Sequence, residues 1–123
     1  MKRLPRISPA EWQVMKIAWA GSQVLAREVI ARLAASRKWH PKTIRTLLAR
    51  LVKKRALAFH KQGRAYLYRP LLTEAECVRA ESQAFLDRVF DGALAPMLAH
   101  FLEGRKIAES ERRELALLLD AKK

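Results

Sequence analysis

The feature that most constrains this chain is an amphipathic segment at residues 41–54, where apolar residues recur at the spacing of one helical face. Pro41 suits the first turn of a helix, where its missing N–H costs nothing. The segment therefore predicts a helix held to a core by one stripe. The residues of this stripe are Ile44, Leu47, Leu48, Leu51 and Val52.

The same helical period turns a basic and hydroxyl-bearing face away from the stripe. Lysine and arginine suit phosphates, and short hydroxyls with forked guanidinium groups suit base edges, so this face is a candidate DNA-reading surface. The alternative is a solvated helix face that is merely basic. The candidate residues, with the helix-entry histidine, are His40, Lys42, Thr43, Arg45, Thr46, Arg50 and Lys53.

The formal net charge is +13 and the sequence pI is about 10.8, which favours nucleic acid or an anionic surface as partner. The charge is concentrated: residues 1–70 contain 17 lysines and arginines but two acidic residues, whereas residues 71–123 contain 8 and 10. So sharp a change predicts two domains, at 1–70 and 71–123, of which only the first binds a polyanion.

The sequence predicts that the first domain is a winged helix-turn-helix. Ser8 and Glu11 predict a capping box that opens a helix ending near residue 21, and a second helix spans 26–35 after a short extended link. Two helices joined by a short turn, the later one carrying a polar face, are typical of a helix-turn-helix.

After residue 54 the pattern changes from helix to strand. Residues 56–61 and 65–70 flank a turn at 62–64 and predict a two-stranded hairpin, the wing. Lys61 and Arg64 beside its tip are placed to reach phosphates.

Residues 71–123 predict three amphipathic helices, at about 74–91, 94–103 and from 110–111 on, the first of them opened by a capping box at 73–76. About 50 residues can hardly bury so much apolar surface alone, so we interpret them as a dimerisation domain. The alternative is a small helical cap on the first domain. The residues assigned to dimerisation are Phe85, Leu86, Val89, Phe90, Leu94, Met97, Leu98, Phe101, Leu102, Leu115, Leu118 and Leu119.

Catalysis, cofactors and metals find little support in the sequence. His40, His60 and His100 lie far apart without metal-ligand spacing, no glycine-rich phosphate loop occurs, and nothing pairs a nucleophile with a base. We therefore predict no enzyme, no cofactor and no metal site.

The sequence also predicts a cytoplasmic protein that does not insert into a membrane. No run of about 18 apolar residues occurs, and the basic amino terminus lacks the apolar core of a signal peptide. The single cysteine, Cys77, excludes an internal disulfide and is interpreted as a small buried side chain in a reducing compartment.

Three stretches resemble the BlaI/MecI family of penicillinase repressors. They are residues 7–16 (ISPAEWQVMK), residues 39–48 (WHPKTIRTLL) and residues 63–68 (GRAYLY), and the likeness continues at 85–92 and 98–102. The resemblance thus extends over nearly the whole chain, with specific motifs.

This resemblance implies a homodimeric winged-helix transcriptional repressor. Repressors of this family bind palindromic operators with TACA/TGTA half-sites, upstream of β-lactam resistance genes and often of their own operon. By similarity, the third helix enters the major groove of double-stranded DNA. The positions that match DNA contacts of the family are Lys42, Thr43, Thr46 and Arg50.

The resemblance also implies a route of release. Family repressors are inactivated by proteolysis in the dimerisation domain, after a membrane sensor with a zinc protease domain detects antibiotic. The matching bond is His100–Phe101, where many relatives carry Asn before Phe. The copper-responsive branch carries Cys-x-Cys pairs near its carboxyl end, and this chain has none, so we do not expect copper sensing.

The sequence leaves other functions open. A BlaI-like regulator could control unrelated stress genes. A non-specific architectural protein would coat DNA without preferring one site, and an adaptor would use the basic face on an acidic protein. Preference for one palindrome over bulk DNA separates the first of these from the others.

Overall fold

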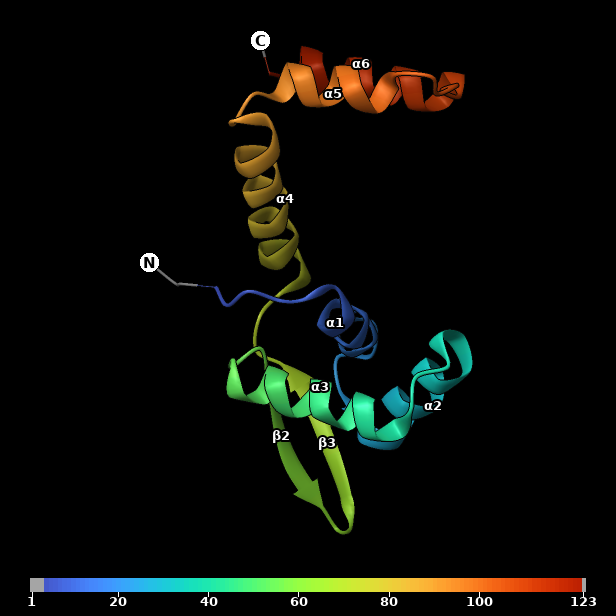
Figure 1. The fold of residues 1–123 in the computed structure, drawn as a ribbon, viewed down its shortest axis with the longest axis vertical. Helices are drawn as coiled ribbons and strands as arrows, with labels where there is room; N and C mark the ends of the chain where they lie inside the picture. The colour runs from blue at the N-terminus through green and yellow to red at the C-terminus, as the bar shows by residue number, and fades with distance from the viewer. Residues whose placement is uncertain (1–3, 123) are drawn as a thin grey trace. The chain divides into compact units, whose positions relative to one another are not determined.

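The computed structural model describes residues 4–122, which form six helices and a three-stranded sheet (Figure 1). They divide into two compact units, one up to Ala80 and one from Glu81 on. The mainly helical architecture predicted from the sequence is confirmed. The elements are α1 (Pro9–Gly21), β1 (Val24–Leu25), α2 (Ala26–Arg37), α3 (Pro41–Lys53), β2 (Leu57–Gln62), β3 (Ala65–Pro70), α4 (Glu74–Phe90), α5 (Leu94–Leu102) and α6 (Glu109–Asp120).

Two helices begin with the predicted capping boxes. At α1, the Glu11 N–H donates to Ser8 Oγ at 3.1 Å, and the Ser8 N–H donates to Glu11 Oε1 at 2.8 Å. At α4, Thr73 and Glu76 exchange the same pair of bonds, at 3.1 and 3.3 Å. Each box satisfies two backbone N–H groups that the first helical turn would otherwise leave without acceptors.

The core of the first unit forms around the apolar stripe of α3. Ile44, Leu48 and Leu51 are at most 1% exposed, and they belong to one cluster with buried residues of α1, α2 and β2. Burying a side chain of this size contributes about 1.5–3 kcal/mol. The stripe therefore fixes how α3 is rotated on the unit. Its partners in the cluster include Val14, Met15, Ala18, Val29, Leu33 and Leu57.

The sheet has one strand more than the sequence predicted. β3 lies in the middle, with β2 on one side and the two-residue β1 on the other, and both pairings are antiparallel. The predicted hairpin is present, and the link at residues 24–25 joins it as an edge strand. Gln62 pairs with Ala65, so the turn contains only Gly63 and Arg64 rather than three residues. Gly63 has a φ of 64°, which glycine adopts without strain.

The segment after the sheet is tied to α1. The Trp19 indole N–H donates to the Leu72 carbonyl at 2.8 Å, and the Trp12 and Trp19 rings meet edge to face at 5.5 Å. Both tryptophans are half-buried against the core, and Leu72 and Cys77 are buried within it. The division between the units consequently falls after Ala80, ten residues beyond the predicted position.

The second unit contains the later part of α4 together with α5 and α6. Phe85 and Phe90 of α4 meet Phe101 of α5, with ring centres 6.2 and 6.3 Å apart. Between residues 81 and 122, no described side chain is fully buried, and Leu117, Leu118 and Leu119 are 60–70% exposed. This unit, taken by itself, has ring contacts but no buried core.

An ion pair joins the start of α1 to the residue that follows α3. Glu11 is 1% exposed, and its Oε1 accepts from Lys54 Nζ at 2.6 Å. The same ammonium donates to the Arg6 carbonyl at 2.7 Å. A buried carboxylate is costly unless it is paired and hydrogen-bonded, and here it is both.

We predict that Lys54→Met destabilises the protein by about 1–3 kcal/mol. Removing one partner of a buried pair costs about 3–5 kcal/mol, and the lower figure allows for the partial exposure of Lys54. Chemical denaturation followed by circular dichroism measures the loss. Lys53→Met, at an exposed neighbouring position, is the matched control and should change stability by less than about 0.5 kcal/mol. Equal losses would show that the ion pair adds nothing.

The pair also gives the stability a pH dependence of known sign. Burial raises the pKa of Glu11, but the hydrogen bonds from Lys54 and Ser8 and the charge of Lys54 outweigh it, so the net pKa lies below its ordinary 4.5. The carboxylate therefore stabilises the fold above pH 4.5, and this contribution disappears as the pH falls through the lowered pKa. The stability difference between wild type and Glu11→Gln should be constant at neutral pH and shrink in acid.

Candidate nucleic-acid interface

The predicted DNA-reading residues of α3 all lie on its exposed side. The buried stripe of the helix faces the core, so the intervening positions face solvent. We call these exposed residues the basic face. They are Lys42, Thr43, Arg45, Thr46, Arg50 and Lys53. Contact of this face with DNA stays a prediction at this point.

His40 is the N-cap of α3. Its Nδ1 accepts a hydrogen bond from the Lys42 N–H at 3.0 Å. A neutral imidazole that accepts at Nδ1 carries its proton on Nε2. Because His40 is exposed, this Nε2–H is left as a donor at the helix start, where the unpaired N–H groups of the first turn also favour anions.

One hydroxyl of the basic face is already used in part. Thr46 Oγ1 donates to the Lys42 carbonyl one turn earlier at 3.0 Å. Its proton is therefore bound within the helix, while its lone pairs can still accept a bond from outside. The arginine and lysine side chains of the face make no ion pair within the described residues, so their donors are available to a polyanion.

The hairpin of β2 and β3, here called the wing, carries the two other predicted residues. Lys61 and Arg64 are both exposed. Lys61 Nζ lies 5.9 Å from the centre of the Tyr66 ring, and Phe59 meets Tyr66 and Tyr68 at 5.6 and 5.7 Å. These rings stiffen the wing beneath its cations.

The wing and the basic face meet at an open hollow, which we call the arginine hollow. Arg27 of α2, Arg45 of α3 and Arg64 of the wing all line it, with the Tyr66 ring. Arg45 and Arg64 are among the residues predicted from the sequence to bind DNA, whereas Arg27 is not. No pattern along the chain indicated that the start of α2 lies beside the wing.

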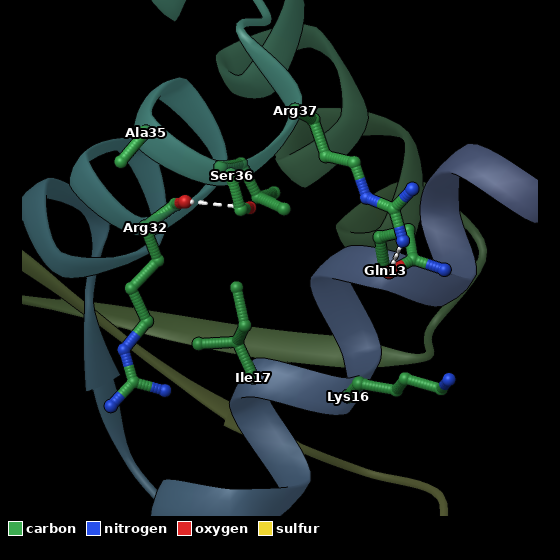
Figure 2. A pocket seen from close by; sticks show the side chains of 8 residues that line it. Gln13, Lys16, Ile17, Arg32, Ala35, Ser36 and Arg37 are labelled. Atoms are coloured by element: carbon green, nitrogen blue, oxygen red, sulfur yellow. Dashed lines mark hydrogen bonds between the residues drawn. The ribbon is translucent and has the colours of Figure 1, made fainter.

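A second basic hollow lies between α1 and α2 (Figure 2). Lys16, Arg32 and Arg37 line it, and Arg37 is held by a 3.1 Å hydrogen bond to the Gln13 side-chain oxygen. None of the predicted DNA-binding residues contributes to it. The basic side chains of the first unit therefore surround at least two separate hollows, of which only the arginine hollow adjoins the basic face.

Residues 4–122 contain no group of three or more His, Cys, Asp or Glu side chains placed to hold a metal ion. Nor does any helix in that range combine the length and the apolar character needed to cross a membrane.

Comparison with known proteins identifies the family. Residues 7–121 match the profile described as penicillinase repressor. The chain belongs to the penicillinase repressor family. The chain is 42% identical to the penicillinase repressor of Bacillus licheniformis, over all of this chain and 96% of that protein. It is 33% identical to the methicillin resistance regulatory protein MecI of Staphylococcus aureus, over 94% of both.

Solved structures of penicillinase repressors match the first part of the chain. The DNA-binding domain of the repressor BlaI aligns with a TM-score of 0.56 and 47% identity, covering 62% of this chain and 93% of that one. The monomeric form of Bacillus licheniformis BlaI in complex with the blaP half-operator aligns with a TM-score of 0.55 and the same identity and coverage. The winged-helix fold predicted from the sequence is thereby confirmed, and the family consists of transcriptional repressors rather than enzymes, as predicted.

We predict that Arg50→Ala weakens binding to a palindromic operator more than binding to random DNA. An arginine that reads a guanine contributes about 1–3 kcal/mol of discrimination, whereas a phosphate contact contributes equally to every sequence. Fluorescence anisotropy titrations with both duplexes at one salt concentration measure the difference. Arg32→Ala, outside the basic face, is the control and should change neither affinity. Equal losses for Arg50→Ala would make this residue a phosphate contact.

Proposed function

We propose that this chain is a homodimeric repressor that binds palindromic operator DNA upstream of β-lactam resistance genes. The observation that carries the proposal is the basic face of α3, which is rotated outward by the buried stripe and adjoins the wing. A relative that is 47% identical over this unit was solved in complex with a half-operator, which supports the same mode of binding here.

In this proposal α3 lies in the major groove and the wing contacts the adjacent backbone. The candidates for base contact are Thr43, Thr46 and Arg50, because their side chains are short or forked. Lys42, Lys53 and Lys61 carry point charges suited to phosphates. His40 donates to a phosphate near the start of α3. Repression follows from occlusion, since polymerase cannot use promoter DNA that the repressor covers.

The exposed apolar side chains of the second unit support the proposal of a dimer. None of its described side chains is fully buried, and four leucines present more than half of their area: Leu94 of α5 and Leu117, Leu118 and Leu119 of α6. A second copy of the same surface would bury these groups, and symmetric pairing is the usual solution for a homo-oligomer. Two joined DNA-binding units then act as one binding event, with half-sites spaced by whole helical turns of about 34 Å.

Release by proteolysis would act on this dimer. His100–Phe101 lies in the last turn of α5, where both side chains are exposed and a helix frays most easily. Phe101 contacts Phe85 and Phe90, so a cut before Phe101 would separate it and α6 from the rest of the unit. Loss of the paired surface would leave monomers that bind DNA weakly. A cytoplasmic repressor cut in response to a membrane sensor fits this scheme.

The test of the proposed function is a competition between one palindrome and bulk DNA. A duplex with inverted TACA/TGTA half-sites should be preferred over random duplex by about a thousandfold or more at physiological salt, because a repressor must find its site among many competitors. Equal affinities would instead identify an architectural protein that coats DNA. If the protein binds neither duplex at low salt, the basic face is not a DNA-binding surface, and the alternative of an adaptor that binds an acidic protein is favoured.

We predict that Phe90→Asp converts the dimer to monomers in sedimentation velocity experiments, because a charge would enter the apolar surface of the second unit. Phe90 also contacts Phe85 and Phe101, so this variant could disturb the unit itself. Leu118→Asp, at a position 61% exposed, tests the surface without touching these rings and should have the same effect.

Val78→Asp provides the matched control for the dimer. Val78 is a 45% exposed apolar residue of the same helix α4 but belongs to the first unit and to no proposed interface. It should leave the sedimentation coefficient unchanged. Dimers that persist in both Phe90→Asp and Leu118→Asp would place the interface elsewhere.

A further inference from the structure

The arginine hollow brings together three cations from parts of the chain that are distant in sequence. Arg27 stands in the first turn of α2, Arg45 near the middle of α3, and Arg64 in the turn of the wing. No aspartate or glutamate lines the hollow. Three guanidinium groups around one space repel one another, so an anion that enters the hollow is favoured.

Nothing within the described residues neutralises these three side chains. None of them takes part in a hydrogen bond or an ion pair there, and all three are exposed. In the other basic hollow, one of the three cations, Arg37, donates a hydrogen bond to the neutral side chain of Gln13 (Figure 2). The groups of the arginine hollow are thus left for an external partner.

The position of the hollow indicates that the anion is a phosphate of the DNA backbone. Arg45 belongs to the basic face, and Arg64 belongs to the wing, so the hollow lies between the two parts proposed to contact DNA. A backbone that runs from the groove occupied by α3 toward the wing passes this point. Guanidinium forks match phosphate oxygens in geometry, and Tyr66, which also lines the hollow, carries a hydroxyl of a kind that donates to phosphates.

We propose that the arginine hollow binds one phosphate of the DNA backbone through Arg27, Arg45 and Arg64 together. The inference rests on the proposed function and extends it, because it adds Arg27 and assigns three residues to a single phosphodiester. The bound phosphate fixes the position of α3 along the groove, since α2, α3 and the wing all hold the same point of the backbone.

The experiment replaces the phosphates of one half-site, one at a time, with neutral methylphosphonates. The probe is a duplex of about three helical turns carrying the inverted TACA/TGTA half-sites, and the full chain is titrated against each version. Wild type should lose about tenfold in affinity at each phosphate that it contacts through one charged hydrogen bond, and more at the phosphate that the three arginines share.

Arg27→Gln and Arg64→Gln should each weaken binding to the unmodified duplex by about tenfold. Both variants should then lose less affinity than wild type when methylphosphonate replaces one particular phosphate, and this position should be the same for the two. Both residues are exposed, so the variants should melt at the wild-type temperature. Arg32→Gln, on the same helix α2 but lining the other hollow, is the matched control and should reproduce the wild-type scan.

Two results would overturn the shared phosphate: reduced sensitivity at different positions for Arg27→Gln and Arg64→Gln, or a wild-type scan for Arg27→Gln. A wild-type protein that prefers the palindrome but gives either result refutes only this inference. A wild-type protein without preference for the palindrome refutes the proposed function first. The two failures are therefore distinguishable in the same set of titrations.

Discussion

The burial of one stripe of α3 is the constraint on which the rest of the first unit depends. Ile44, Leu48 and Leu51 are removed from water almost completely, and a helix that buries one side must expose the other. The orientation of the cations is thus a consequence of apolar packing, not of any interaction among the cations. The Lys54–Glu11 pair then holds the far end of the helix against α1, so that the exposed side is presented at a fixed angle.

Most of this unit could be predicted from the sequence because its determinants are local. Capping boxes involve residues three apart, and a helical stripe is visible within four turns. What escaped prediction depends on contacts between distant residues. The strand pairing of Val24 with Tyr68, the ion pair of Glu11 with Lys54, and the placing of Arg27 and Arg64 at one hollow have no signature in the neighbouring residues. The predicted boundary after residue 70 differed from the observed one for the same reason, since Leu72 and Cys77 return to the core of the first unit.

The two units differ in how far they bury their apolar side chains. The first has enough elements to enclose a set of fully buried side chains, whereas the second arranges phenylalanine rings in contact but encloses none. In the proposed dimer, the stability of the second unit depends on protein concentration, as it does for any fold completed by association. A cell could adjust repression through the amount of repressor as well as through its integrity.

The short strand β1 has a mechanical consequence. Val24 and Leu25 are hydrogen-bonded to the middle strand of the sheet and lead without a gap into α2. A displacement of the hairpin is therefore transmitted to the amino end of α2, and the hairpin and α2 move together. In the proposed complex, distortion of the double helix near the hairpin tip is transmitted to α2 in this way, so that the shape of the duplex, and not only its bases, affects the affinity.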